Sequence, residues 1–168
     1  VHNASNHMFF RVDSPNNIGK INLNEVDYDY KLIVISDYDK GFLSESDIQT
    51  ICENHDNVFI DSKKILGDWA SKAKFIKIND YEYKRSEKFI SDELKSKIIH
   101  TMGGDGCRYQ NKVYKVNKVD VKDTSGAGDS FLAGLVIEYL KSNDIEKSIS
   151  FANKCASEVV KHRGVTVI

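Results

Sequence analysis

Short apolar runs along the chain alternate with longer segments in which apolar residues recur every three or four positions. The runs are rich in β-branched and aromatic residues, which is typical of strands in a buried sheet. Leu32-Ile33-Val34-Ile35 is apolar at every position, so we expect this strand to be buried on both faces. The expected strands lie at residues 8–12, 32–35, 58–60, 75–78 and 98–99, with one or two more within 109–121 around a hairpin tip at 111–112, and a turn is expected at 14–17.

The longer segments carry helix signals. Ser44-Glu45-Ser46-Asp47 resembles a capping box, and apolar residues follow it at helical spacing. Strands and helices that alternate along the chain predict one α/β domain with a mostly parallel sheet. The first expected helix follows Ser44, with Ile48, Ile51 and Cys52 on one face, and the second covers 82–97. The third begins at Asp129, and the fourth covers 145–160. The apolar stripe of the third consists of Phe131, Leu132, Leu135, Val136, Tyr139 and Leu140.

The composition is ordinary for a soluble globular protein, with 40% hydrophobic and 29% charged residues among 168. The formal net charge of -1 gives no electrostatic reason to expect nucleic acid or an anionic membrane as a partner. The apolar runs are too short to span a bilayer and the first residues show no signal pattern, so we expect a cytoplasmic protein. Cys52, Cys107 and Cys155 are far apart, which predicts reduced thiols, two of them in the core, rather than a zinc site or disulfides.

The segment Asp123-Thr124-Ser125-Gly126-Ala127-Gly128-Asp129 joins an expected strand to an expected helix. Its glycines leave the backbone bare, so an anion can approach N–H groups at a helix N-terminus, where the dipole favours negative charge. Such donors suit a phosphoryl group in transfer, whose charge spreads over its outer oxygens. Asp129, in the first turn, can accept a proton from an attacking hydroxyl. The alternative is a glycine turn in which Asp129 only caps the helix.

Two other phosphate-binding patterns do not fit this segment. Phe131 stands where the third glycine of G-x-G-x-x-G belongs, and no Walker A loop occurs in the chain. A dinucleotide fingerprint or a P-loop is therefore not expected.

The heptad resembles the D-T-x-G-A-G-D signature of PfkB-family (ribokinase-type) carbohydrate kinases, and three more of the family's motifs follow its order. Asn79-Asp80-Tyr81-Glu82 matches N-x-x-E, Thr101 to Gly106 matches T-x-G-x-x-G, and Phe151-Ala152-Asn153 with Ala156 resembles the helix whose Asn meets the purine. The resemblance covers 10–167. It implies one partial ribokinase-like domain over 1–168, a three-layer α/β/α fold whose N-terminal strands and most of the lid are missing, with 1–14 as a remnant of a lid strand.

The resemblance also implies an activity, phosphoryl transfer from ATP to a sugar hydroxyl, and assigns roles to individual residues. Asp129 would be the base, and Gly126, Ala127 and Gly128 would form the anion hole. Mg²⁺ would lie near Glu82, without direct ligation. The nucleotide would meet Asn79, Glu82, Thr101, Gly103, Gly106 and Asn153, and K⁺ would have Asp123, Ser125, Val159, His162 and Gly164 as its candidate neighbours.

The substrate assignment rests on one segment. Ser36-Asp37-Tyr38-Asp39-Lys40-Gly41 looks most like the S-D-Y-x-K-G of heptose 7-phosphate kinases, the kinase part of ADP-heptose synthesis enzymes. Asp37 and Lys40 would then contact the sugar phosphate. Val58 to Lys63 resembles the V-x-I-D-P-K of these kinases, with Ser62 in place of proline, whereas Lys77-Ile78-Asn79 departs from their T-P-N.

Other interpretations stay open. The family binds sugar through an N-terminal half with a Gly-Gly motif that this chain lacks, so the chain could be a non-catalytic fragment or an assembly subunit that pairs with a complementary half. A homodimer is the other expected assembly. Each site motif also has a simpler interpretation: Asn79 as a helix cap, Glu82 as a solvated side chain, Asn153 as a polar residue on an apolar helix face, Lys40 as a turn lysine, 101–106 as a plain turn and the K⁺ candidates as an ordinary loop.

Overall fold

The computed structural model describes residues 19–164, and its centre is a six-stranded sheet in the order β1-β2-β3-β4-β5-β6. The first four strands are parallel and the last two antiparallel, which confirms the expected mostly parallel sheet. The expected strand at 8–12, the turn at 14–17 and the lid remnant at 1–14 lie outside the described residues. The strands are β1 (Ile33–Asp37), β2 (Val58–Ser62), β3 (Phe75–Asn79), β4 (Ile98–Thr101), β5 (Cys107–Tyr109) and β6 (Lys112–Tyr114).

Helices connect the parallel strands and follow the hairpin. The predicted capping box at Ser44 and Asp47 forms, and it opens the first helix. The α-helices are α1 (Glu45–Asn54), α2 (Asp80–Ser86), α3 (Asp92–Lys97), α4 (Ala127–Ser142) and α5 (Ile145–Val159), with short 3-10 helices η1 (Leu23–Glu25), η2 (Asp68–Ala70), η3 (Glu87–Phe89) and η4 (Gly103–Asp105). Among the described helices, none is both long enough and apolar enough to cross a membrane.

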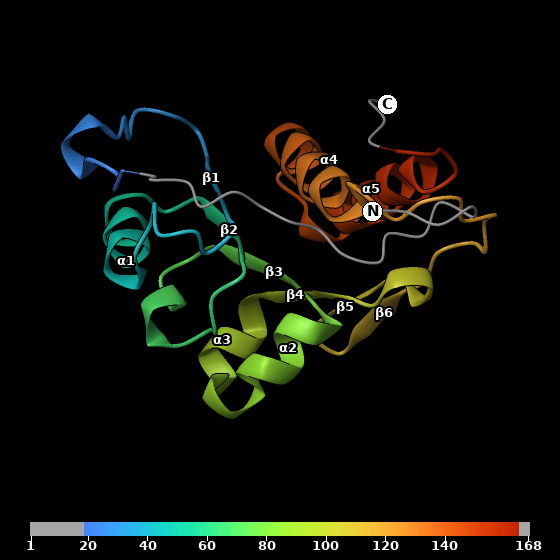
Figure 1. Ribbon diagram of the computed structural model, residues 1–168, viewed down its shortest axis with the longest axis horizontal. Coiled ribbons are helices and arrows are strands. Elements are labelled where there is room, and N and C mark those ends of the chain that lie inside the picture. The colour runs from blue at the N-terminus through green and yellow to red at the C-terminus, as the bar shows by residue number, and fades with distance from the viewer. Residues whose placement is uncertain (1–18, 165–168) are drawn as a thin grey trace.

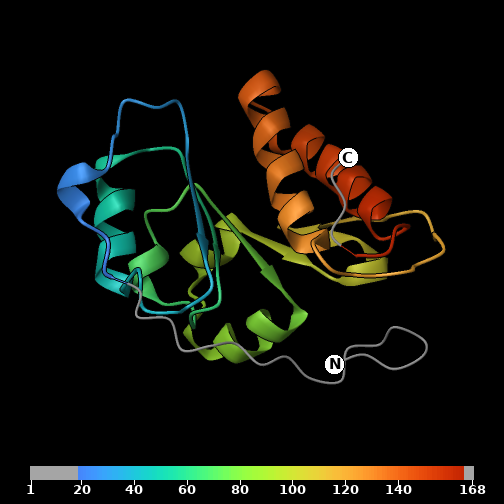
Figure 2. The ribbon, with the colours of Figure 1, turned by 45° about the horizontal axis from the view of Figure 1, so that its top comes forward.

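The sheet separates two hydrophobic cores, because side chains along a strand point alternately to its two faces. On β2, Val58 and Ile60 pack with α1 and α3, whereas Phe59 packs with α4 and α5 on the other side. Figures 1 and 2 show α4 and α5 together on one side of the sheet and α1, α2 and α3 away from them. The expected three-layer α/β/α arrangement is therefore confirmed.

The expectation that β1 is buried on both faces was wrong. Ile35 is buried, but Val34 is 43% exposed and Ser36 is exposed as well. Within residues 19–164, β1 pairs with β2 alone and forms the edge of the sheet. The continuous apolar sequence predicted an interior strand, and the topology leaves one of its faces uncovered.

Three boundaries also differ from the sequence prediction. The helix expected over 82–97 is divided into α2, η3 and α3, because Ser91 caps a new helix through its hydroxyl. The chain from 115 to 126 forms no strand, and the hairpin turns at 110–111, where Gln110 has a φ of 52°. Leu140 is 50% exposed, since its neighbour Tyr139 supplies the ring that packs in the core.

Candidate functional site

Along β2 and β3, aromatic residues near the start of each strand are followed by charged residues near its carboxyl end. On the face of the sheet toward α4, Phe59 lies opposite Phe75 in the ladder, and two positions later Asp61 lies opposite Lys77. Both charged residues are buried, and the Lys77 Nζ lies 2.5 Å from the Asp61 Oδ2. In parallel α/β sheets ligands bind outside the carboxyl ends of the strands, so this pair marks the functional edge.

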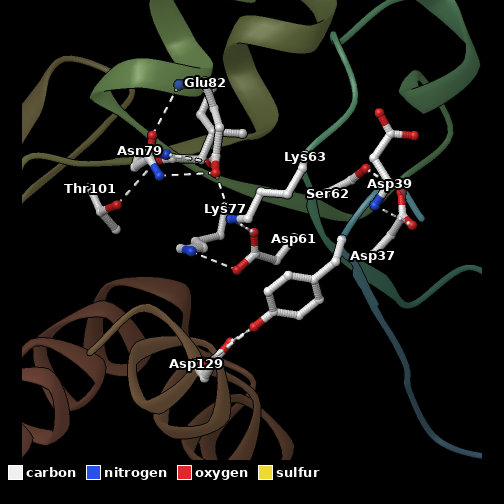
Figure 3. A network of polar contacts seen from close by, with 12 residues as sticks. Asp37, Asp39, Asp61, Ser62, Lys63, Lys77, Asn79, Glu82, Thr101 and Asp129 are labelled. Carbon is white, nitrogen blue, oxygen red and sulfur yellow. Dashed lines mark hydrogen bonds and ion pairs between the residues drawn. The ribbon is translucent and has the colours of Figure 1, made fainter. Parts of the chain in front are cut away.

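The charges continue from this pair towards α2 (Figure 3). The Lys63 Nζ lies 3.4 Å from the Asp61 Oδ1 and 2.5 Å from the Glu82 Oε1. Burial alone would lower the pKa of Lys63, but the hydrogen bond to Glu82 and the charge of Asp61 outweigh it and raise that pKa. Lysines and carboxylates therefore alternate along a row whose formal charges cancel. The row runs in the order Lys77, Asp61, Lys63 and Glu82.

Asn79 and Glu82 close the first turn of α2 as a reciprocal capping box. The Asn79 side chain accepts from the Glu82 N–H at 3.0 Å, and the Glu82 Oε2 accepts from the Asn79 N–H at 2.8 Å. The simpler interpretation of Asn79 as a helix cap is thus geometrically correct. Glu82, however, is only 3% exposed, so its interpretation as a solvated side chain was wrong. Thr101 lies opposite Asn79 in the ladder, and its hydroxyl donates to the Ile78 carbonyl oxygen.

The turn before α4 lies above this row. Gly126 is the N-cap residue with a φ of 77°, a left-handed conformation that favours glycine, and no side chain caps the helix. A Cβ placed on Gly128 would lie 3.0 Å from the Lys77 Nζ, so the bare backbone of α4 meets the buried ammonium. The segment that leads into this turn is a loop, which corrects the expectation of a preceding strand.

Asp129 extends from the first turn of α4 into the space in front of the sheet. It is exposed, and its carboxylate accepts from the Tyr38 hydroxyl at 3.1 Å and 3.3 Å. Burial and the neighbouring carboxylate charge both raise the pKa of Tyr38. Because Gly126 is the cap, the alternative of Asp129 as a simple cap finds no support in the geometry.

Two of the expected nucleotide residues, Gly106 and Asn153, meet at one backbone oxygen. The Asn153 Nδ2 donates to the Tyr114 carbonyl at 3.0 Å, and a Cβ on Gly106 would lie only 2.1 Å from the same oxygen. Gly106 has a φ of 87° and Gly103 a φ of 57°, so both need the freedom of glycine. Beside this point lies an open groove of about 420 Å³, whose lining includes Tyr114, Lys115, Asn117, Asn153, Lys154 and Ser157.

The two expected sugar-phosphate contacts lie at the end of β1. Asp37 is buried, and its carboxylate accepts from the Ser62 hydroxyl at 2.7 Å and from the Asp39 N–H at 3.0 Å. Lys64 pairs with the same carboxylate at 3.4 Å. Lys40 is exposed in the turn that follows the strand. The structure thus gives Asp37 a role in fixing this turn.

Asp123 ties the turn before α4 to the end of α5. Its carboxylate accepts from the Ser125 N–H at 2.9 Å and from the Gly164 N–H at 3.0 Å. The hydrogen bonds from Ser125, followed by that from Gly164, lower the pKa of Asp123. Val159 and His162 are joined by a backbone hydrogen bond at the end of α5, so all five K⁺ candidates belong to this junction.

Several residues of the site were missed by the sequence prediction. Tyr38, Asp61, Lys63 and Lys77 were quoted there only as parts of motifs or departures from them. Each lies at or just beyond the carboxyl end of a parallel strand, and that position was a usable signal.

Comparison with known proteins identifies the family and the relatives of this chain. The family model described as pfkB family carbohydrate kinase matches residues 23–168. Among curated proteins, a probable chloroplastic fructokinase-6 of Arabidopsis thaliana is 33% identical over 126 residues, covering 61% of this chain and 32% of the relative. The bifunctional protein HldE of Nitratiruptor sp. is 30% identical over 150 residues, covering 79% and 32%.

Solved structures support the fold. A nucleoside kinase of Burkholderia thailandensis, in complex with inosine, superposes with a TM-score of 0.67 at 21% identity, covering 84% of this chain and 53% of that one. A ribokinase of Thermotoga maritima gives 0.68 at 16% identity, covering 86% and 56%. The chain thus spans about a third of the length of these curated relatives and about half of these solved chains.

Proposed function

The chain belongs to the pfkB family of carbohydrate kinases, and we propose that it forms the nucleotide-binding and phosphoryl-transfer part of an ATP-dependent sugar kinase. The observation that carries this proposal is the start of α4. There an uncapped, glycine-bearing helix N-terminus, a buried ammonium and an exposed carboxylate come together within the first turn. The ammonium comes from Lys77 of β3 and the other two groups from α4, far away in the sequence.

The groups around this turn suit the charges of phosphoryl transfer. The N–H groups of the turn at Gly126 to Gly128 point from a helix N-terminus and stabilise negative charge on the transferred group. Asp129 lies next to that position and accepts the proton of the acceptor hydroxyl. Because the transition state is largely dissociative, charge stabilisation and alignment contribute most of the rate, and proton removal follows late.

The residues present fit a nucleotide and its Mg²⁺. The left-handed glycines of the 103–106 turn allow close backbone approach, and the groove beside Asn153 offers room and polar groups for a base and ribose. Lys115 and Lys154 add positive charge to that groove. Glu82 and Asp61 are engaged by Lys63, Lys77 and the Asn79 N–H, so they would hold a bound Mg²⁺ through its water molecules and not as direct ligands. The Mg²⁺ would neutralise phosphate charge.

Isothermal titration of the chain with a non-hydrolysable ATP analogue and Mg²⁺ tests the nucleotide part. A saturable binding event that Mg²⁺ strengthens is expected. Absence of binding by a chain that circular dichroism shows to be folded would refute the proposal.

Heptose 7-phosphate is our proposal for the acceptor, because Ser36 to Gly41 resembles heptose kinases and HldE is among the relatives. Fructokinases match as well, so the assay compares heptose 7-phosphate, fructose and nucleosides as acceptors. Preferential phosphorylation of fructose or a nucleoside would replace the heptose assignment.

A second candidate function is an assembly subunit that pairs with a separate sugar-binding chain. The exposed edge of the sheet favours it, since Val34, Tyr38 and Phe42 on or next to β1 are 43%, 52% and 45% exposed. A parallel strand of another chain could cover this edge. Light scattering with and without an added N-terminal half of a related kinase distinguishes the two: complex formation with restored transfer supports the pairing, and sugar phosphorylation by the chain alone contradicts it.

A further inference from the structure

Lys77 is a buried lysine whose position differs from that of an ordinary structural ion pair. Its side chain is 4% exposed, and its ammonium contacts Asp61 from the neighbouring strand. Removing a lysine and an aspartate from water is costly, and two apolar side chains of similar volume would usually be at least as stable. The apolar residues Phe59 and Phe75 occupy the equivalent positions one step earlier in the same two strands. Because the apolar pair precedes the charged pair of Asp61 and Lys77 in the same two strands, we look for a functional reason for the charges.

The hydrogen bonds of Lys77 leave room for a ligand. An ammonium group carries three N–H donors. Within residues 19–164, the Asp61 Oδ2 is its one hydrogen-bond acceptor, at 2.5 Å. For the other two donors, no acceptor lies within hydrogen-bonding distance among the described residues. Buried donors of this kind are normally satisfied, so an anion that arrives at this place would gain the full strength of a charge-assisted bond.

The place where those donors lie is the turn proposed to hold the transferred phosphoryl group. A Cβ on Gly128 would come within 3.0 Å of the Lys77 Nζ, which puts the ammonium directly under the first turn of α4. The helix N-terminus and the ammonium thus act on the same region from two sides. Asp129 extends from the same turn towards Tyr38 (Figure 3).

On these contacts, we propose that Lys77 binds the terminal phosphoryl group of the nucleoside triphosphate, with Asp61 as the carboxylate that holds its ammonium in place. This proposal rests on the proposed function, because it names a further phosphate ligand of that site. Lys63 plays a different part, since its ammonium is engaged by both Asp61 and Glu82.

The test measures how much the phosphates contribute to affinity. Calorimetry compares the affinities for adenosine and AMP-PNP. The buffer contains EDTA, so that an effect of Asp61 or Glu82 on metal binding cannot change the measured affinities. The variants are Lys77→Met, which leaves Asp61 with Lys63 as its remaining partner, and the double variant Asp61→Asn/Lys77→Met, which removes both charges of the pair. Lys74→Met is the matched control, because Lys74 lies three residues away with an exposed side chain.

In the parent and in Lys74→Met, AMP-PNP should bind more tightly than adenosine. In the double variant this ratio should fall about ten- to a hundredfold, the worth of a hydrogen bond to a charged group, while the adenosine affinity stays unchanged. A folded double variant that keeps the ratio would show a structural ion pair only and overturn the inference. Failure of the parent itself to bind AMP-PNP or adenosine, both in EDTA and with Mg²⁺ added, would instead overturn the proposed function.

A second measurement needs no variant. An acyl-phosphate derivative of ATP transfers its acyl group to a lysine beside the phosphates, forming an amide and releasing ATP. Mass spectrometry should find the amide on Lys77, with loss of labelling in excess AMP-PNP. Competable labelling that is confined to other lysines would contradict the proposal, even if the variants do not fold.

Discussion

The Tyr38 hydroxyl donates to the carboxylate of Asp129 across 91 positions of sequence, at 3.1 Å and 3.3 Å to its two oxygens. The contact joins the turn after β1, which carries the heptose-like motif, to the helix that carries the proposed base. A hydroxyl that donates to the base occupies the same relation to Asp129 as the acceptor hydroxyl of a sugar would.

Tyr38 should titrate above the ordinary tyrosine range. Burial and the Asp129 charge raise its pKa, so the folded chain keeps this proton at pH values where the unfolded chain loses it. The contribution to stability is complete below about pH 10 and is lost as pH rises through the folded pKa. The difference in absorbance at 295 nm between the parent and Tyr38→Phe isolates this group. In Asp129→Asn the titration should move back towards the ordinary value, and an unchanged curve would show that the two residues do not interact.

Asp129→Asn should separate chemistry from nucleotide binding. The substitution keeps the size of the side chain and removes the proton acceptor, so kcat should fall about 10²–10⁴-fold, towards the lower end because proton removal is late. The nucleotide dissociation constant should stay within a few-fold of the parent. The assay uses the chain completed by a sugar-binding half. Full activity would make Asp129 dispensable, whereas collapse of nucleotide affinity would point to a structural or metal-linked role.

Gly106→Ala should damage the nucleotide side of the site. The residue has a φ of 87°, and a Cβ there would lie 2.1 Å from the Tyr114 carbonyl oxygen. Strain and overpacking together should lower the free energy of unfolding by about 2 kcal/mol or more. Gly104→Ala is the control, since nothing lies within 4 Å of its Cβ position. Urea unfolding of both variants checks this, and equal midpoints would mean that the turn adapts.

The cysteines should differ in reactivity. Burial raises the pKa of Cys52 to about 11 and that of Cys107 to about 12, so both remain thiols at neutral pH. Their contribution to stability is present below pH 9, the ordinary thiol value, and is lost as pH rises through 11 to 12. With Ellman's reagent at pH 8, the half-buried Cys155 should react first and the other two only in urea. Rapid reaction of all three in the native chain would indicate a loosely packed core.

We propose that a monovalent cation binds where Asp123 joins the turn before α4 to the end of α5. Hydrogen bonds from Ser125 and Gly164 keep the pKa of this carboxyl low, so it is charged at neutral pH. AMP-PNP should bind about fivefold or more tightly in KCl than in choline chloride, the range of a typical coupling between sites. Asp123→Asn should remove the difference. Equal affinities in K⁺, Na⁺ and choline would argue against the site.

The sequence by itself determined the short-range features, namely the capped start of α1, the apolar stripe of α4 and the motif that precedes α4. Ser44 and Asp47 lie within one turn of helix, so their capping box is legible in four consecutive letters. The stripe from Phe131 to Leu135 follows the helical period. Asp123 to Asp129 is also local, because consecutive residues build the whole turn. Such features depend on backbone geometry over a few residues, and sequence order is enough to predict them.

The tertiary structure decided which of these elements meet, and that decided the site. The register of β2 against β3 pairs Asp61 with Lys77. Lys63 reaches Glu82 because β2 and β3 end at the same edge of the sheet. Gly128 meets Lys77 because α4 packs on the face of the sheet that carries Lys77. The exposure of Val34 likewise depends on what lies beside β1, although its sequence is that of an interior strand. Periodicity describes one element at a time, whereas register, layer and edge are relations between elements, and packing of the whole chain fixes them.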